Sequence, residues 1–131
     1  MDSLSNGQTV LHYRIIEKIG QGGMGEIYRA EDLRLGRQVA IKILLSSVED
    51  KEELARERLL REARSASLLN HPNIVTIHAI EQFEDSDFIV MEYIEGETLG
   101  FILQTGKPDL SAIFEIGAQI ADALSAAVLY S

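Results

Sequence analysis

Short runs rich in strand-forming residues make up much of the first 93 residues, and turn residues separate them. The first three runs are joined by a glycine-rich stretch and by a charged turn, residues 31–37, that contains Gly36. The last two runs are parted only by the polar segment 84–86, which predicts a hairpin. Strands are expected at 13–19, 26–30, 38–45, 74–83 and 87–93. Together they predict one antiparallel sheet of five strands.

A long helix is predicted between the third and fourth strands, over residues 46–70. Apolar residues or their neighbours recur there at intervals of three or four: Leu54, Leu59, Ala63, Ala66 and Leu69. Ser46 or Ser47 is the expected N-cap, and the acidic residues that follow suit the positive end of a helix. Pro72 ends the helix, because proline disfavours helical geometry in the residue before it. A packing or turn role is expected for His71, as for His12 and His78.

Two more helices are predicted after the sheet, a short one over 99–106 and a long one over 111–130, with Pro108 and Asp109 between them. The polar residues of the long helix form a single narrow stripe: Ser111, Glu115, Gln119, Asp122 and Ser125. Every other face is apolar, so a helix of this kind belongs inside a larger protein. If nothing covers its apolar faces, we expect self-association or disorder.

Composition narrows the class of protein. The 131 residues suffice for one domain at most, and 46% hydrophobic residues allow a real core. There is no cysteine, so disulfides and thiolate metal sites are excluded. The net charge of −9 argues against a nucleic-acid partner. No signal peptide and no uncharged run of about 18 residues is found, so a cytoplasmic location is expected.

Three glycines carry the first chemical signal. Gly20, Gly22 and Gly25 fit the spacing G-x-G-x-x-G, which frees backbone N–H groups to close on phosphate oxygens. Dinucleotide-binding proteins share this spacing, but there the third glycine opens a helix. Here residues 26–30 favour a strand. The glycines are therefore expected to join two antiparallel strands and to lie over a ligand as a flap, and a nicotinamide-dependent oxidoreductase fails on this point.

A lysine on the next strand carries the second signal. Ala40 and Lys42 are two residues apart and so project from the same face of a strand. An apolar methyl group beside an ammonium group suits a base with phosphates attached, and Lys42 would meet the phosphates as a point charge. A mobile hairpin tip would explain the glycines, but it would not explain Lys42.

These two segments together resemble the protein kinases. The glycine stretch, continuing to Ile27, matches G-x-G-x-x-G-x-V with isoleucine in place of valine, and residues 39–42 read V-A-I-K. The sequence Gly-Gly-Met-Gly followed by Ile-Tyr-Arg-Ala resembles the bacterial serine/threonine kinases in particular. The resemblance implies an α+β fold, in which the five-stranded antiparallel sheet with its inserted helix is the kinase N-lobe. The short and the long helix would then begin the C-lobe.

The resemblance also implies residue roles. ATP would be held by Ile19, Gly20, Gln21, Gly22, Gly23, Met24, Gly25, Ile27, Ala40, Lys42, Met91, Glu92 and Ile94. Met91 would limit the depth of the adenine pocket, while the backbone of Glu92 and Ile94 would meet the adenine edge. Glu62 would pair with Lys42, an ion pair that marks the active arrangement. Without the family, Glu62 would be read as a solvated acid, and the apolar residues as ordinary core.

The resemblance divides the chain into three parts: a flexible leader over 1–10, the N-lobe over 11–94, and the hinge exit with the start of the C-lobe over 95–131. The chain departs from the family pattern at Val128, since no H-R-D, D-F-G or A-P-E motif occurs in it. These motifs supply the catalytic base and the Mg²⁺ ligands, so no metal residue is assigned here.

The leading expectation is the ATP-binding lobe of a serine/threonine kinase whose reading frame is truncated or interrupted. Such a chain would bind ATP weakly and would transfer no phosphate to a protein substrate by itself. From a different class, the chain could be a non-catalytic interaction module that pairs with a full-length kinase.

Overall fold

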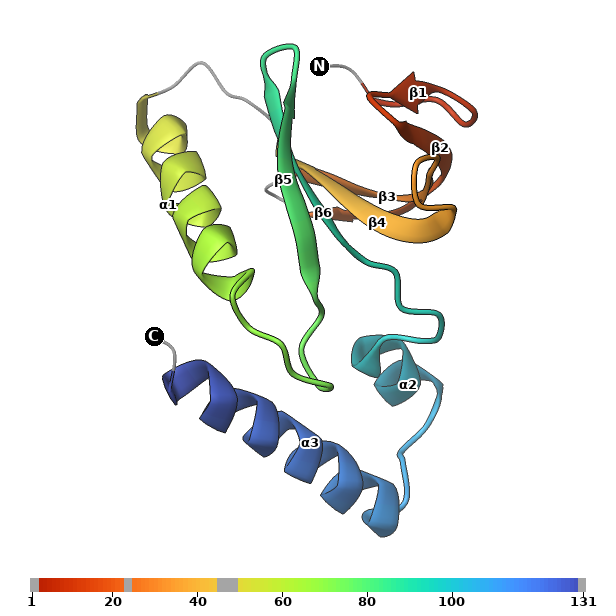
Figure 1. The fold of residues 1–131 in the computed structure, drawn as a ribbon. Coiled ribbons are helices and arrows are strands. Elements are labelled where there is room, and N and C mark those ends of the chain that lie inside the picture. The colour runs from red at the N-terminus through yellow and green to blue at the C-terminus, as the bar shows by residue number, and fades with distance from the viewer. Residues whose placement is uncertain (1–2, 23–24, 45–49, 130–131) are drawn as a thin grey trace.

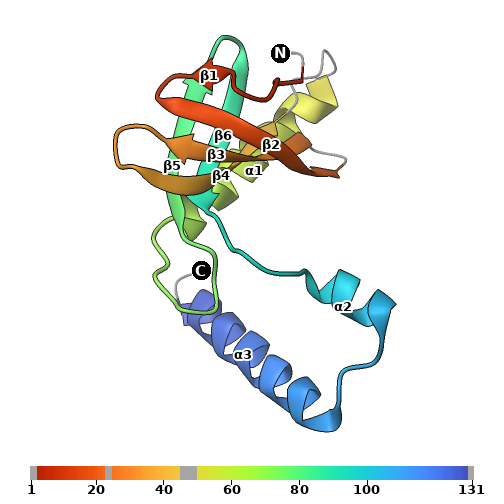
Figure 2. The ribbon, with the colours of Figure 1, turned by 90° about the vertical axis from the view of Figure 1, so that its right-hand side faces the viewer.

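The structure is a computed structural model, and it describes residues 3–22, 25–44 and 50–129. Its strands are β1 (Thr9–Val10), β2 (Tyr13–Gly22), β3 (Gly25–Asp32), β4 (Arg37–Leu44), β5 (Ile77–Phe83) and β6 (Ser86–Glu92). Its helices are α1 (Asp50–Ala66), α2 (Leu99–Thr105) and α3 (Leu110–Leu129). The strands form one antiparallel sheet in the order β1-β2-β3-β4-β6-β5. In Figures 1 and 2, α1 lies beside the sheet, whereas α2 and α3 lie beyond one of its ends.

The α+β architecture with an antiparallel sheet and three helices is as predicted, but the sheet has six strands instead of five. The additional strand is β1, which has two residues and pairs with the start of β2. It falls in the segment that the sequence predicts as a flexible leader. Residues 3–10 instead pack against the sheet, because Leu4 and Val10 are buried in its core. The Gly7 amide also donates a hydrogen bond of 2.7 Å to the Ile15 carbonyl.

The sheet buries apolar side chains on both faces, since successive residues of a strand point to opposite sides. One face carries a core that includes Tyr28, Ile41, Phe88 and Val90. The other face carries a smaller core in which Leu44 and Ile89 of the sheet pack against Leu60 and Ala63 of α1. The amphipathic stripe of α1 therefore fixes that helix on the sheet.

Helix α1 ends at Ala66, four residues before the predicted end at Asn70. Its last turn tightens, because the amides of Leu68 and Leu69 bond to carbonyls three residues earlier. The hydroxyl of Ser67 also donates to the Arg64 carbonyl at 2.6 Å and satisfies one of the free carbonyls at the helix end. The predicted N-caps, Ser46 and Ser47, lie outside the described residues.

The two C-terminal helices are capped by side chains but are poorly covered. Thr98 Oγ1 accepts from the Phe101 amide at 3.1 Å, and Asp109 Oδ1 accepts from the Ala112 amide at 2.8 Å. Neither α2 nor α3 has a buried residue among those described. By length and composition α3 could also cross a membrane, a test that core helices of soluble proteins pass as well. Self-association through its apolar faces stays a prediction.

A contact between a histidine and a carboxylate joins α3 to the segment that follows α1. Nε2 of His71 lies 3.3 Å from a carboxylate oxygen of Asp122. Nδ1 of the same ring accepts a hydrogen bond of 3.0 Å from the Asn73 amide. His71 therefore closes a turn and contacts a helix, which agrees with the structural role predicted for it.

Candidate functional site

The glycine-rich stretch forms the end of β2 and the start of β3. Gly22 pairs with Gly25, and Gly20 pairs with Ile27. A strand, not a helix, begins at Gly25, so the hairpin predicted from the sequence is confirmed and the dinucleotide-binding arrangement is excluded. Gly23 and Met24, which belong to the predicted phosphate-binding stretch, lie outside the described residues.

The glycines of this motif have different surroundings. A Cβ atom on Gly25 would lie 1.8 Å from the backbone carbonyl oxygen of Ile43 in β4. A Cβ atom on Gly22 would meet no atom of the described residues within 4 Å. Gly25 is therefore required by the close approach of β4, whereas the absence of a side chain at Gly22 leaves open space at the hairpin.

The register of three strands places Lys42 beside the glycine hairpin. Gly20 pairs with Ile27, Ile27 pairs with Lys42, and Lys42 pairs with Ile89. Residues paired across antiparallel strands point to the same face. Ala40, two residues before Lys42 on the same strand, shares that face and is 7% exposed. The geometry proposed from the sequence, a lysine on the same face as the glycine flap, is thus present.

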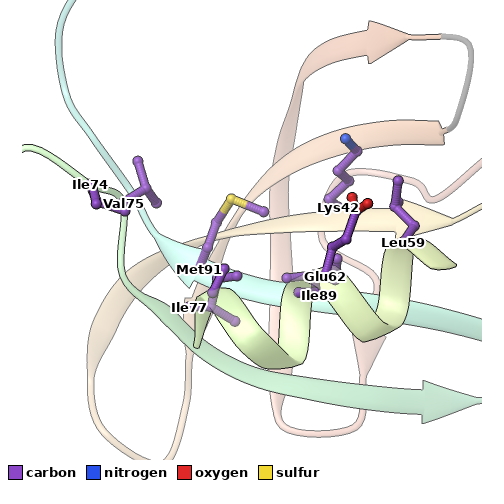
Figure 3. A pocket seen from close by; sticks show the side chains of 10 residues that line it. Lys42, Leu59, Glu62, Ile74, Val75, Ile77, Ile89 and Met91 are labelled. Atoms are coloured by element: carbon purple, nitrogen blue, oxygen red, sulfur yellow. The ribbon is translucent and has the colours of Figure 1, made fainter. Parts of the chain in front are cut away.

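A pocket of about 350 Å³ opens between this face and helix α1 (Figure 3). It is lined by Lys42, Leu59, Glu62, Ala63, Ala66, Ile74, Val75, Ile77, Ile89 and Met91. Lys42 extends from β4 and Glu62 from α1 into this space. In the described part of the chain, no ion pair within 4.0 Å joins Lys42 to an acid. The pairing of Lys42 with Glu62 therefore stays a prediction.

The remaining predicted contacts lie around the hairpin and at the end of β6. Ile19 is 44% exposed and occupies a bulge in β2, since the pairing with β3 shifts between Lys18 and Gly20. Gln21 accepts a hydrogen bond of 2.7 Å from the ammonium of Lys18. Neither lines the pocket described above.

The predicted hinge follows directly from β6. The Glu92 amide donates to the Thr76 carbonyl at 2.8 Å, and Glu92 Oε1 accepts from the Thr76 amide at 3.1 Å. These two bonds fix the last residue of β6. Ile94 is 57% exposed. The roles of Glu92 and Ile94 toward a base stay predictions, because they depend on backbone groups.

Glu26 is a structural residue of this region that the sequence analysis missed. Its carboxylate accepts hydrogen bonds from the hydroxyls of Tyr28 and Ser3 and from the ammonium of Lys18. The Tyr28 hydroxyl, followed by the Ser3 hydroxyl, holds the pKa of Glu26 below its ordinary value of 4.5. Burial and the same carboxylate raise the pKa of Tyr28. The sequence gives only one indication of this contact. Glu26 and Tyr28 are two residues apart on one strand, so both side chains lie on the face of the sheet opposite to that of Ile27.

Replacing Glu26 with glutamine is expected to lower the free energy of unfolding by about 1–2 kcal/mol at pH 7. Because the folded-state pKa is lowered, the stabilisation is present above pH 4.5 and is lost as the pH falls through the folded-state pKa. Urea unfolding of both proteins between pH 3 and 7 measures this. Glu17→Gln, at an exposed ion pair with Arg29, is the control and should change little. A difference that stays constant with pH would contradict the assignment.

Comparison with known proteins identifies the fold. The family model described as the protein kinase domain matches residues 13–129. The chain therefore belongs to the protein kinase family. It is 45% identical over 114 residues to the serine/threonine-protein kinase PrkC of Bacillus subtilis, covering 86% of this chain and 17% of that protein. It is 38% identical over 114 residues to the kinase pkn2 of Myxococcus xanthus, covering 87% and 14%.

Solved structures agree with this assignment. The PknI kinase domain of Mycobacterium tuberculosis matches with a TM-score of 0.81 and 26% identity, covering 95% of this chain and 51% of that one. The chain thus has the kinase N-lobe fold and is similar to bacterial serine/threonine kinases. It spans about half of a solved kinase domain and less than a fifth of PrkC and pkn2.

The residues present fit part of an ATP site. No described atom fills the space beside Gly22 that phosphates would need, and Lys42 offers them a cation that no described acid neutralises within 4.0 Å. Among the described residues, no group of three or more histidine or acidic side chains is arranged to hold a metal ion. When bound to a complete kinase, Mg²⁺ supplies charge neutralisation at the phosphates.

Proposed function

We propose that this chain is the ATP-binding lobe of a bacterial-type serine/threonine protein kinase. The observation that carries the proposal is the row formed by Gly20, Ile27 and Lys42 across three adjacent strands. Backbone N–H groups of the hairpin would bind the phosphates, and the ammonium of Lys42 would meet the phosphate oxygens. Ala40 and Met91 would enclose the adenine base.

In the complete enzyme, this lobe would position ATP for transfer of its terminal phosphate to a serine or threonine hydroxyl of a protein substrate. Positioning and charge neutralisation supply most of the catalysis in this reaction. Glu62 would then act on Lys42, which lines the same pocket, and hold its ammonium in place for the phosphates. The substrate-orienting aspartate and the Mg²⁺ ligands have no counterpart in these 131 residues.

ATP binding to the 131-residue chain is expected to be weak, with a Kd of about 1 mM. In a complete kinase, apolar residues of both lobes would enclose the adenine base. The half that the C-lobe would supply has no counterpart in this chain. Titration with ATP, followed by amide chemical shifts, measures the affinity. Lys42→Met removes the ammonium but keeps the apolar stem, so binding should weaken about tenfold or more. Arg61→Gln, on the exposed side of α1, is the control and should leave binding unchanged. A Kd in the low micromolar range would contradict weak binding, and equal affinity in Lys42→Met would contradict the phosphate role of Lys42.

The same chain is expected to transfer no phosphate by itself. The reaction needs an aspartate at the substrate hydroxyl and ligands that hold Mg²⁺, and the H-R-D and D-F-G motifs that carry them do not occur in this sequence. Incubation with labelled ATP, Mg²⁺ and a generic protein substrate tests this. Labelling should equal that of the Lys42→Ala control. Labelling clearly above the control would show that the chain is competent.

A further inference from the structure

A second hollow lies on the opposite face of the sheet from the Lys42 pocket. Its volume is about 280 Å³. Tyr13, Ala79 and Val90 form its floor, and Val90 points away from the face that carries Ile89 and Met91 because successive strand residues alternate. Tyr13 and Val90 are 3% and 1% exposed. The floor is thus an apolar surface fixed in the core of the domain.

The rim of this hollow is basic. Arg34 and Arg37, from the turn between β3 and β4 and the start of β4, line it together with His12 and His78. Within the described ranges, neither arginine has an acidic side chain within 4.0 Å, whereas Arg14, Arg29 and Arg56 each have one. Two arginines without an ion-pair partner therefore meet at one site of a chain whose net charge is −9.

One acid, Asp32, also lines the hollow, and its carboxylate is already used by the turn. Its Oδ1 accepts from the amides of Arg34 and Leu35 at 2.9 and 3.2 Å and lies 3.8 Å from Nε2 of His12. Asp32 is 4% exposed. Asp32 therefore holds the backbone from which Arg34 extends. Among the described residues its carboxylate forms no ion pair within 4.0 Å with Arg34 or Arg37, but its charge still acts on the hollow.

The pKa shifts of His78 and Tyr13 show that charges of both signs act on this hollow, since Arg37 acts on both residues and carboxylates oppose it. Burial, and after it the charge of Arg37, lowers the pKa of His78, while Glu92 and Asp32 act in the opposite direction. Burial raises the pKa of Tyr13 on the floor, and the carboxylates of Glu81 and Asp32 add to this effect. Neither Glu81 nor Glu92 lines the hollow.

We propose that this hollow binds a phosphate monoester. The planar guanidinium groups of Arg34 and Arg37 would each offer paired donors to the phosphate oxygens, a geometry that favours phosphate over a spherical anion. The organic group of the ester would lie against Leu35, which lines the hollow and is 65% exposed, with the buried Tyr13 and Val90 beneath it. A volume of about 280 Å³ is at the lower end of small-molecule sites, so the ligand is a small ester or a single phosphorylated side chain of a peptide.

The test is an NMR titration of the 131-residue chain with four probes: O-phosphothreonine, a five-residue peptide with a central phosphothreonine, the same peptide without its phosphate, and inorganic phosphate. We expect saturable shifts of the side-chain resonances of Arg34, Arg37 and His78, with a Kd of about 1 mM for phosphothreonine. Inorganic phosphate should bind at least about threefold more weakly, because it has no organic group to contact the exposed apolar lining residue, Leu35. Tighter binding of the phosphopeptide would identify a phosphorylated side chain as the ligand, and equal binding would identify a free ester.

Arg34→Gln/Arg37→Gln should weaken phosphothreonine binding at least about tenfold. Arg34→Gln alone, at an exposed turn position, provides a second variant that preserves the fold, and its amide spectrum checks this. Arg61→Gln and Lys42→Met are the controls and should leave the Kd unchanged. Shifts that do not saturate, equal affinity for the unphosphorylated peptide, or an unchanged Kd in the double variant would overturn the proposal.

Discussion

Replacing Gly25 with alanine is expected to lower the free energy of unfolding by about 3 kcal/mol or more, at or beyond the upper end of the usual cost of overpacking. The added methyl group would lie 1.8 Å from the Ile43 carbonyl oxygen, which is part of the backbone and cannot rotate away. Relief requires β3 to move away from β4 at the point where Gly25 pairs with Leu44. Urea unfolding at pH 7 measures the loss.

Gly22→Ala is the matched control, because the two glycines pair with each other across the same hairpin. A methyl group at Gly22 meets no atom within 4 Å in the part of the chain that the structure describes, so the free energy of unfolding should change by less than about 0.5 kcal/mol. We expect ATP binding to weaken in Gly22→Ala in spite of its normal stability. Equal losses of stability in the two variants would contradict the distinction.

This contrast shows that the glycines of the motif are needed for different physical reasons. Sequence spacing suggests that Gly20, Gly22 and Gly25 all serve phosphate binding. The structure gives Gly25 a second reason, the approach of the β4 backbone, which depends on a strand almost 20 residues away in the sequence. No local pattern reveals such a contact, since it is a property of the assembled sheet.

The elements that the sequence predicts well are those set by local rules. Strand-forming runs and turn residues locate β2 to β6, and helical spacing locates α1 and α3. The position of Lys42 opposite Ile27 follows from the same rules, since period-two geometry and a short turn fix the face. The pocket next to Lys42 also depends on α1. The amphipathic stripe of this helix predicts that it packs on the sheet.

The sequence does not reveal contacts between residues that are far apart along the chain, particularly where a segment is short or polar. Residues 3–10 have no periodicity, and yet Leu4 is buried in the core, and its amide bonds to the hydroxyl of Tyr28, 24 residues away. Glu26 is buried for a related reason, since three donors from separate positions converge on its carboxylate. Composition alone favours solvent exposure both for residues 3–10 and for Glu26. The same argument applies to the hollow at Arg34 and Arg37, which only the folded sheet brings next to His78.

Tyr28 connects these contacts, and Tyr28→Ala is expected to lower the free energy of unfolding by about 3–5 kcal/mol. The ring is 1% exposed in the core of the face opposite α1. Its hydroxyl donates to Glu26 and accepts from the Leu4 amide at 3.0 Å. The alanine variant therefore loses the buried ring and both hydrogen bonds. Because a whole domain is stabilised by only about 5–15 kcal/mol, this loss can unfold much of the population at room temperature.

Tyr28→Phe separates the two contributions, because it keeps the ring and removes only the hydroxyl. It should cost about 1–3 kcal/mol, since the buried Leu4 amide loses its acceptor and Oε2 of Glu26 loses its donor, while Oε1 keeps the Ser3 hydroxyl and the Lys18 ammonium. The pKa of Glu26, followed by carbon NMR of its carboxyl group, should rise in Tyr28→Phe, because the Tyr28 hydroxyl is the largest cause of its lowering. If Tyr28→Phe matched the wild type in both stability and the Glu26 pKa, the hydroxyl would not hold the N-terminal segment to the sheet.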